Sequence, residues 1–177
     1  MRLRLYQGVM SQPLSSPDAA SALKCELASE VLCSFGSLRF AATGWSMLPT
    51  IRSGDTLAIE RVSINQVRKG DVVLVGRDSR LCAHRVVSRL ENSGNTFCIT
   101  RGDAMPAPDR PVLESELLGR VTYLMRGEKR IAVPPALSAV DALIAMIVRR
   151  SFLAARVLVY LHRVLQTPEE SVSPCQG

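Results

Sequence analysis

The sequence has few aromatic side chains and few histidines, with one Trp, three Tyr, four Phe and two His among 177 residues. Binding of single-stranded nucleic acid depends on aromatic stacking as well as on positive charge. The net charge of +6 therefore does not by itself predict a nucleic-acid partner, and we expect none. Only one histidine, His84, precedes the C-terminal segment, so imidazole chemistry in the body of the protein depends on this residue.

The cysteine pattern argues against two kinds of cross-link. The cysteines are odd in number and contain no Cys-x-x-Cys pair, so neither a zinc site nor a closed set of disulfides is predicted. We expect no metal, no cofactor and a reducing compartment for the bulk of the chain. The cysteines are Cys25, Cys33, Cys82, Cys98 and Cys175.

The first residues lack the run of about 7–15 apolar residues that a secretory signal needs. We expect no export signal and a flexible leader over residues 1–20. Residues 21–36 predict an amphipathic helix that ends near Gly36. This helix is too short and too charged to span a membrane. Its apolar positions are Leu23, Leu27, Val31 and Leu32.

Residues 37–133 change to short β-type runs separated by turns that contain glycine. The unbroken apolar run at residues 72–75 indicates a strand buried on both faces, and the mixed run at residues 81–90 indicates a half-buried strand. Many short strands with little helix between them predict a mainly β domain, an antiparallel barrel or sandwich. The turns are Ser53-Gly54-Asp55, Lys69-Gly70-Asp71, residues 92–95, Arg101-Gly102-Asp103 and Arg126-Gly127.

Residues 134–166 read as a helical segment that is both apolar and basic, followed by a flexible tail over residues 167–177. Three arrangements are open for this segment: a helix lying in a membrane interface, a short spanning or re-entrant segment, or packing on a protein surface, including the domain itself. Asp141 disfavours spanning, because a carboxylate at the centre of a bilayer costs about 2.5–3.5 kcal/mol. We expect a membrane surface as a partner through residues 134–166. The protein would then be membrane-associated, peripherally or through its C-terminal part, and otherwise cytoplasmic.

One turn carries a candidate nucleophile. Ser46 lies in the sequence Gly44-Trp45-Ser46-Met47-Leu48-Pro49-Thr50, where apolar residues flank its hydroxyl. Taken alone, this is ordinary turn composition, and Met47 or Leu48 could simply fill the core. The turn gains meaning only if the chain also supplies a proton acceptor.

A base and an acid follow Ser46 in chain order. A hydroxyl becomes a nucleophile when a neighbour removes its proton, and an imidazole suits that task near neutral pH. His84 lies on a predicted strand, where a histidine is more often structural than catalytic. A carboxylate from Asp103 or Asp109 would orient the imidazole and stabilise its protonated form. From the residues alone, both aspartates remain candidates.

Five motifs together resemble the successive conserved boxes of type I signal peptidases, within the S24/S26 peptidase superfamily. They resemble most closely the archaeal and endoplasmic-reticulum branch, in which histidine replaces the bacterial general-base lysine. The resemblance covers roughly residues 38–122 in matching order and spacing. The motifs are Gly44-x-Ser46-Met47-x-Pro49-Thr50-Ile51-x-x-Gly54-Asp55, Gly70-Asp71-Val72-Val73, His84-Arg85-Val86-Val87, Thr100-Arg101-Gly102-Asp103-Ala104 with Asp109 six residues after Asp103, and Leu118-Gly119-Arg120-Val121.

The resemblance implies the β-fold shared by signal peptidases and self-cleaving repressor-type proteases, with an N-terminal helix and a C-terminal helical appendage added here. It implies a serine endopeptidase in which Ser46 is the nucleophile, His84 the general base, Asp109 the triad acid and Asp103 a supporting acid. It also implies peptide or precursor-protein substrates with small residues at the cleavage site, of the Ala-x-Ala kind. Lys69, in a turn outside the base-supplying box, is a poor substitute for His84.

The chain departs from the resemblance beside the nucleophile. Many relatives carry a hydroxyl two residues before the serine, where this chain has Gly44, so the oxyanion would depend on backbone N–H groups or on Thr43. Trp45 is either a core anchor or a residue that narrows the substrate groove, and we place Met47 with it at the groove. The absence of an N-terminal anchor also fits a dedicated processor of one leader peptide. Gly44 and Trp45 motivate an alternative, a weakly active or non-catalytic module that binds peptides or docks on membranes.

Overall fold

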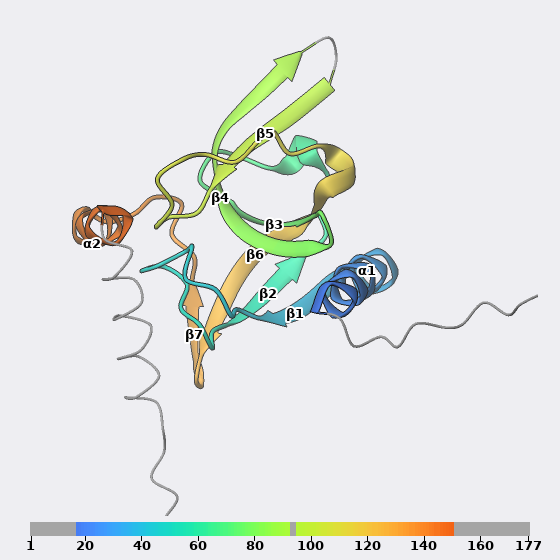
Figure 1. Ribbon diagram of the computed structural model, residues 1–177, viewed down its shortest axis with the longest axis horizontal. Helices are drawn as coiled ribbons and strands as arrows, with labels where there is room; N and C mark the ends of the chain where they lie inside the picture. Colours follow the sequence, from blue (N-terminus) through green and yellow to red (C-terminus); the bar gives the residue numbers. More distant parts are fainter. Residues whose placement is uncertain (1–16, 93–94, 151–177) are drawn as a thin grey trace, which may run out of the picture.

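The computed structural model describes residues 17–92 and 95–150 and has a mainly β architecture (Figure 1). A seven-stranded antiparallel sheet and two α-helices make up this part of the chain, which confirms the predicted fold class. The strands are β1 (Ser37–Ala41), β2 (Thr56–Glu60), β3 (Val72–Arg77), β4 (Arg80–Asn92), β5 (Asn95–Arg101), β6 (Leu117–Arg126) and β7 (Lys129–Ala132). The helices are α1 (Pro17–Phe35) and α2 (Ala139–Arg150), with short 3₁₀ turns at η1 (Ile64–Gln66) and η2 (Glu114–Glu116).

The sheet runs in the order β1-β2-β6-β3-β4-β5, and β7 pairs with β6. Strand β4 is long enough to pair with two partners in turn. Its first half pairs with β3, and β5 joins it only from Arg85 onward. The outer parts of β4 and β5 form a hairpin that projects from the body of the molecule (Figure 1). Among the described strands, residues 80–84 of β4 therefore pair along one edge only.

Strand β3 is the centre of the core, as its apolar run predicts. Val72 and Leu74 lie in one buried cluster with residues of α1, β2 and β6. Val73 and Val75 lie in a second cluster on the other face of the sheet. Full burial of a side chain of this kind stabilises the fold by about 1.5–3 kcal/mol. The two clusters hold β3 and its neighbour β4 in place, and β4 carries His84.

Helix α1 begins at Pro17, earlier than the predicted residue 21, and ends at Phe35 before Gly36, which has a φ of 70°. It contacts the sheet through Ala28 and Leu32, whereas Leu23 and Leu27 are about half exposed. Of the predicted apolar positions, Leu32 thus faces the sheet, whereas Leu23 and Leu27 do not. The close approach of α1 to β3 explains this difference. A Cβ at Gly76 of β3 would lie only 2.9 Å from Cys25 Sγ of α1.

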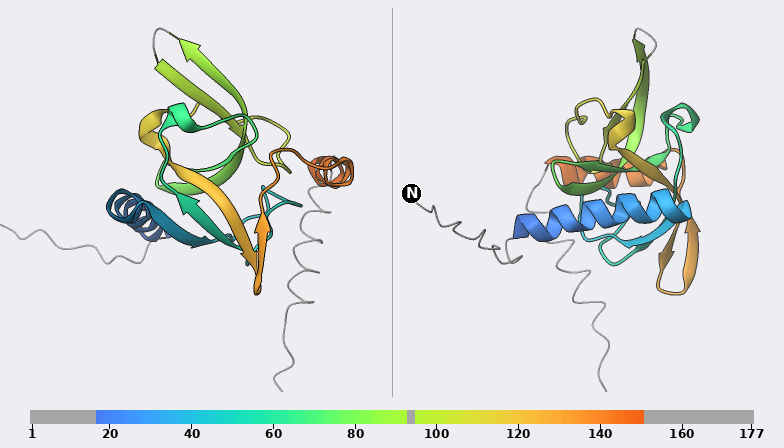
Figure 2. Two further views of the ribbon diagram at one scale, coloured as in Figure 1. Left: turned by 180° about the vertical axis from the view of Figure 1, so that it is seen from behind. Right: turned by 90° about the vertical axis from the view of Figure 1, so that its right-hand side faces the viewer.

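Helix α2 begins after Ser138, whose hydroxyl accepts a hydrogen bond of 3.1 Å from the Asp141 N–H. Asp141 therefore lies in the first turn of the helix, where a carboxylate is favourable. The two helices lie on opposite sides of the sheet (Figures 1 and 2). Neither of them combines the length and the apolar character needed to cross a bilayer. Residues 151–166 of the predicted basic segment, residues 1–16 of the predicted leader and the predicted tail over 167–177 lie outside the described residues.

Candidate active site

Ser46, His84 and Asp109 come together in one chain of polar contacts. Ser46 Oγ lies 3.0 Å from His84 Nε2, and His84 Nδ1 lies 2.6 Å from Asp109 Oδ2. The serine comes from the loop between β1 and β2, the histidine from β4 and the aspartate from the loop after β5. Three segments far apart in the sequence thus meet at one point.

Asp109 is held in place and kept ionised by its neighbours. Its N–H donates to the Thr100 carbonyl at 2.8 Å, and the Thr100 hydroxyl donates to Asp109 Oδ2 at 2.7 Å. Burial alone would raise the pKa of Asp109, but the hydrogen bonds from His84 and Thr100 outweigh burial and lower this pKa below its ordinary value. The carboxyl group is therefore a carboxylate at neutral pH.

This carboxylate determines where the proton of His84 lies. An ionised carboxylate can only accept hydrogen bonds, so Nδ1 of His84 carries a proton and donates it to Asp109. In the neutral ring, Nε2 then has a free lone pair and accepts from the Ser46 hydroxyl. The arrangement meets the geometric requirement for removal of the serine proton, namely a base within about 2.6–3.2 Å of the hydroxyl oxygen.

Asp103 has different partners from Asp109. Its carboxylate forms a two-pronged pair with Arg85, at 2.8 Å to Nε and 2.9 Å to Nη2. The Thr50 hydroxyl also donates to it, at 2.6 Å. Asp103 and Arg85 are both buried. Of the two aspartates left open by the residues alone, Asp109 contacts His84 and Asp103 ties the serine loop to β4.

The loop around Ser46 is held from two sides. The Ala104 N–H donates to the Ser46 carbonyl at 2.8 Å, which joins the loop to the segment that carries Asp103. On the other side, Arg126 pairs with the Asp55 carboxylate at 2.7 Å and donates to the Thr50 carbonyl at 3.2 Å. These contacts place the nucleophile by tertiary interactions at both ends of its loop.

Gly102 is needed where these segments meet. A Cβ at this position would lie 2.6 Å from the Ser46 carbonyl oxygen and 3.1 Å from His84 Nε2. The first of these distances is shorter than any real Cβ contact, and its neighbour is backbone. The absence of a side chain at Gly102 therefore allows the loop after β5 to approach both the nucleophile and the base.

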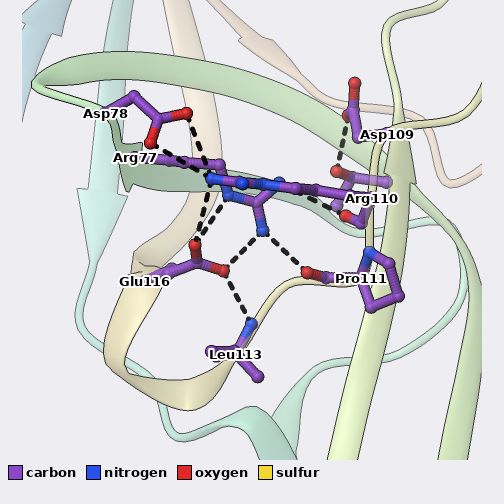
Figure 3. Close-up of polar contacts among 8 residues, drawn as sticks. Arg77, Asp78, Asp109, Arg110, Pro111, Leu113 and Glu116 are labelled. Carbon is purple, nitrogen blue, oxygen red and sulfur yellow. Dashed lines mark hydrogen bonds and ion pairs between the residues drawn. The ribbon is translucent and has the colours of Figure 1, made fainter.

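A further ion pair, which the sequence analysis did not identify, holds the loop that carries Asp109 (Figure 3). Arg77, at the end of β3, donates through Nε to Glu116 Oε1 at 2.7 Å and through Nη2 to the Pro111 carbonyl, also at 2.7 Å. It also donates to the Arg110 carbonyl at 3.3 Å. Hydrogen bonding to Arg77, helped by the Leu113 N–H, lowers the pKa of Glu116 to about 2 despite the opposing effect of burial. Because Arg77 and Glu116 are 39 positions apart, no local pattern marks the pair.

The residues predicted for the oxyanion site and groove divide into two groups. The Met47 side chain is buried in the core, and Trp45 packs against the cluster of Leu48, Ala104 and Val148. Only the backbone of Met47 is thus available to a substrate. Thr43 and Gly44 are exposed, and a Cβ at Gly44 would have nothing within 4 Å.

The environment of His84 also bears on the choice of base. The lysines Lys24, Lys69 and Lys129 are exposed and lie on α1, on the turn before β3 and on β7. Ser46 Oγ instead has an imidazole at hydrogen-bond distance. A cavity of about 500 Å³ opens beside His84 and Asp109 and is also lined in part by Cys82 and Thr100. The base side of the candidate site is therefore open to a ligand.

Comparison with known protein families identifies the family to which this fold belongs. The family model described as Peptidase S24-like matches residues 19–121, which include Ser46, His84 and Asp109 and cover more than half of the chain. Comparison with curated proteins and with solved structures gives no match. The family match agrees with the S24/S26 superfamily and indicates a fold of the serine-peptidase type. The chain therefore belongs to the S24-like family of peptidases.

Proposed function

We propose that this protein is a serine endopeptidase that resembles type I signal peptidases of the histidine type. The observation that carries the proposal is the chain of contacts from Ser46 Oγ through His84 to Asp109, with distances of 3.0 and 2.6 Å. A buried ion pair between Arg85 and Asp103 stabilises the segments that carry these residues. Ser46 is the proposed nucleophile, His84 the general base and Asp109 the acid that orients it.

The proposed reaction hydrolyses a peptide bond in two steps. Ser46 Oγ attacks the carbonyl carbon while His84 Nε2 takes the hydroxyl proton, and the same proton then passes to the departing amine. The acyl-enzyme is hydrolysed by a water molecule, whose proton His84 accepts and returns to Ser46. The carboxylate of Asp109 stabilises the protonated imidazole in both steps. Within the described residues, the N–H groups of Ser46 and Met47 are not engaged by any backbone carbonyl, which suits them to stabilise the oxyanion.

The substrates we propose are extended peptides with small side chains near the cleaved bond, of the Ala-x-Ala kind. Residues 80–84 of β4 offer a strand edge that no described strand occupies, and this edge leads to His84. A peptide in β conformation can pair with such an edge. Signal or leader peptides have this extended character next to their cleavage sites.

The test is cleavage of an Ala-x-Ala reporter peptide by the wild type, Ser46→Ala and His84→Ala. Either substitution should reduce kcat by at least about 10³-fold, because the nucleophile and the base act as a unit. Lys69→Ala, at an exposed turn residue, serves as the control and should retain wild-type activity. Equal cleavage by the wild type, Ser46→Ala and His84→Ala would refute the proposal.

A second candidate is a weakly active or non-catalytic peptide-binding module on the same fold. Gly44 favours it, because no side chain at that position can donate to the oxyanion. A fluorophosphonate probe separates the two, since it labels only a serine that a base activates. Labelling of Ser46 that His84→Ala abolishes supports the enzyme, and absence of labelling in the wild type supports the module.

A further inference from the structure

Helix α2 is apolar on two opposite sides. Its inner side packs through Val148, with Ile144, against Leu48 and Ala104, and Ala145 is buried as well. The side that points away from the domain is open to solvent. We call it the outer face of α2 and define it by Val140, Leu143, Met146 and Ile147, which are 67%, 52%, 51% and 52% exposed. Val140, Leu143 and Ile147 follow one another at intervals of three and four positions, and Met146 lies beside them on the same side of the helix.

We propose that the outer face of α2 docks on the surface of an anionic lipid membrane. Four exposed apolar side chains on one helix mark an interaction surface, since isolated exposed apolar residues would not gather in this way. The described part of the helix spans about 18 Å, so one stripe of this part covers on the order of 200 Å². This is well below the roughly 800 Å² per partner of a stable protein interface. A membrane interface can bind an apolar face of this size when basic residues add to it.

The charge of the sequence from α2 onward agrees with this partner. The described part of α2 includes Arg149-Arg150, and Arg156 and Arg163 follow in the sequence. No Asp or Glu occurs between Asp141 and Glu169 in the sequence. Basic residues near an anionic leaflet are attracted to its surface. Apolar burial and charge therefore favour the same surface.

The inner side of α2 connects this docking surface to the candidate active site. Leu48 lies two residues after Ser46, and Ala104 follows Asp103 and donates its N–H to the Ser46 carbonyl. Docking would thus hold the serine loop close to the lipid surface. We infer that the preferred substrates are peptides presented at a membrane, an inference that rests on the proposed function.

Vesicle co-sedimentation of the full chain tests the docking without using activity. The experiment uses Ser46→Ala as the parent, with vesicles of phosphatidylcholine alone or with roughly one-third phosphatidylglycerol. The parent should bind the anionic vesicles, and binding should weaken as salt shortens the Debye length from about 10 Å at 0.1 M. Adding L143E/I147E should lower the partition coefficient by about tenfold or more, because two charges replace apolar contacts.

The matched control is L90E/L113E, which places the same charges at two positions that are 47% and 46% exposed on other elements. It should bind vesicles as the parent does, and both double variants should keep the parent's unfolding midpoint. Equal vesicle binding by L143E/I147E and the parent would overturn the proposal, as would failure of the parent to bind anionic vesicles. A stable dimer of the parent that L143E/I147E converts to monomer would also overturn it, in favour of a second copy on this face.

The inference about substrates has its own readout. Enzyme with an intact Ser46 should cleave a vesicle-tethered reporter faster than the same peptide in solution, and L143E/I147E should remove only that advantage. Equal rates on the two reporters would overturn this inference while leaving the peptidase proposal standing. Failure to cleave either reporter would count against the proposed function, and the sedimentation result would still decide whether α2 binds lipid.

Discussion

Arg85 Nη1 donates a hydrogen bond of 2.6 Å to the carbonyl oxygen of Pro134, so the side chain that pairs with Asp103 also holds the start of the C-terminal segment. The same nitrogen donates to the Gly70 carbonyl at 3.0 Å. One buried guanidinium therefore joins β4, the loop before β3, the Asp103 segment and the chain that leads to α2. The candidate active site and the helix proposed to dock on membranes are parts of one packed unit.

The contact between Asp109 and His84 predicts a large catalytic effect with a small structural one. Asp109→Asn should lower kcat by roughly 10³–10⁴-fold, because an amide does not hold the imidazole proton on Nδ1. The unfolding free energy should fall by only about 1.5–3 kcal/mol, the value of a hydrogen bond to a charged group, because the amide oxygen can still accept from Thr100. Both are measurable, from reporter cleavage and from urea denaturation. A kcat within about tenfold of the wild type would contradict the assignment of Asp109 as the acid.

Asp103 should show the opposite behaviour, a large loss of stability. Asp103→Asn leaves the buried guanidinium of Arg85 without its carboxylate, which should lower the unfolding free energy by about 3–5 kcal/mol. Urea denaturation measures this loss of unfolding free energy. The proteins compared all carry Ser46→Ala, so that they cannot cleave themselves during the measurement. The control is Asp78→Asn, because the Asp78–Arg110 pair is exposed and should contribute at most about 1 kcal/mol. Similar losses in the two variants would show that Asp103 has no special structural role.

Gly44 offers a test of the oxyanion site by gain of function. A side chain fits there, since a Cβ would meet nothing within 4 Å. Gly44→Ser should raise kcat by roughly tenfold or more if its hydroxyl reaches the oxyanion, because one donor at such a site contributes about 10²–10³-fold. Gly44→Ala adds the same Cβ without a donor and should leave kcat unchanged. Equal rates for the two variants would mean that the backbone donors already suffice.

The Arg77–Glu116 pair predicts a stability difference that depends on pH. The pKa of Glu116 is lowered from its ordinary 4.5 to about 2, so the folded state favours the carboxylate. This contribution is fully present above about pH 4.5, where both states are ionised, and it disappears as the pH falls through about 2. Glu116→Gln should therefore be less stable than the wild type at pH 7, and the difference should shrink between pH 4.5 and 2.

The same pair gives a positional control. Glu114→Gln changes an exposed carboxyl group two residues away and should leave stability nearly unchanged across this range. Denaturation of the three proteins, all carrying Ser46→Ala, would show the difference directly. A Glu116→Gln deficit that stays constant down to pH 2 would mean that the charge of Glu116 is not what stabilises the loop after Asp109.

The sequence by itself determined the β class of the fold, because the buried strand at residues 72–75 and the glycine-containing turns around it are local signals. It also placed Ser46, His84 and two candidate aspartates in an order that resembles a known family, since short motifs retain their spacing along the chain. The family match over residues 19–121 agrees with that interpretation at the level of the S24-like peptidases. The catalytic roles themselves remain predictions.

The residues alone left Asp103 and Asp109 open and the resemblance implied Asp109, but only the tertiary structure shows which of them contacts His84, because both follow the same strand. It also decided which side of α1 faces the sheet, since the close contact between Cys25 and Gly76 has no signature in either segment. The Arg77–Glu116 pair and the packing of α2 on Leu48 were decided in the same way. Each joins residues that are dozens of positions apart, and contacts of that kind exist only when the whole sheet has formed.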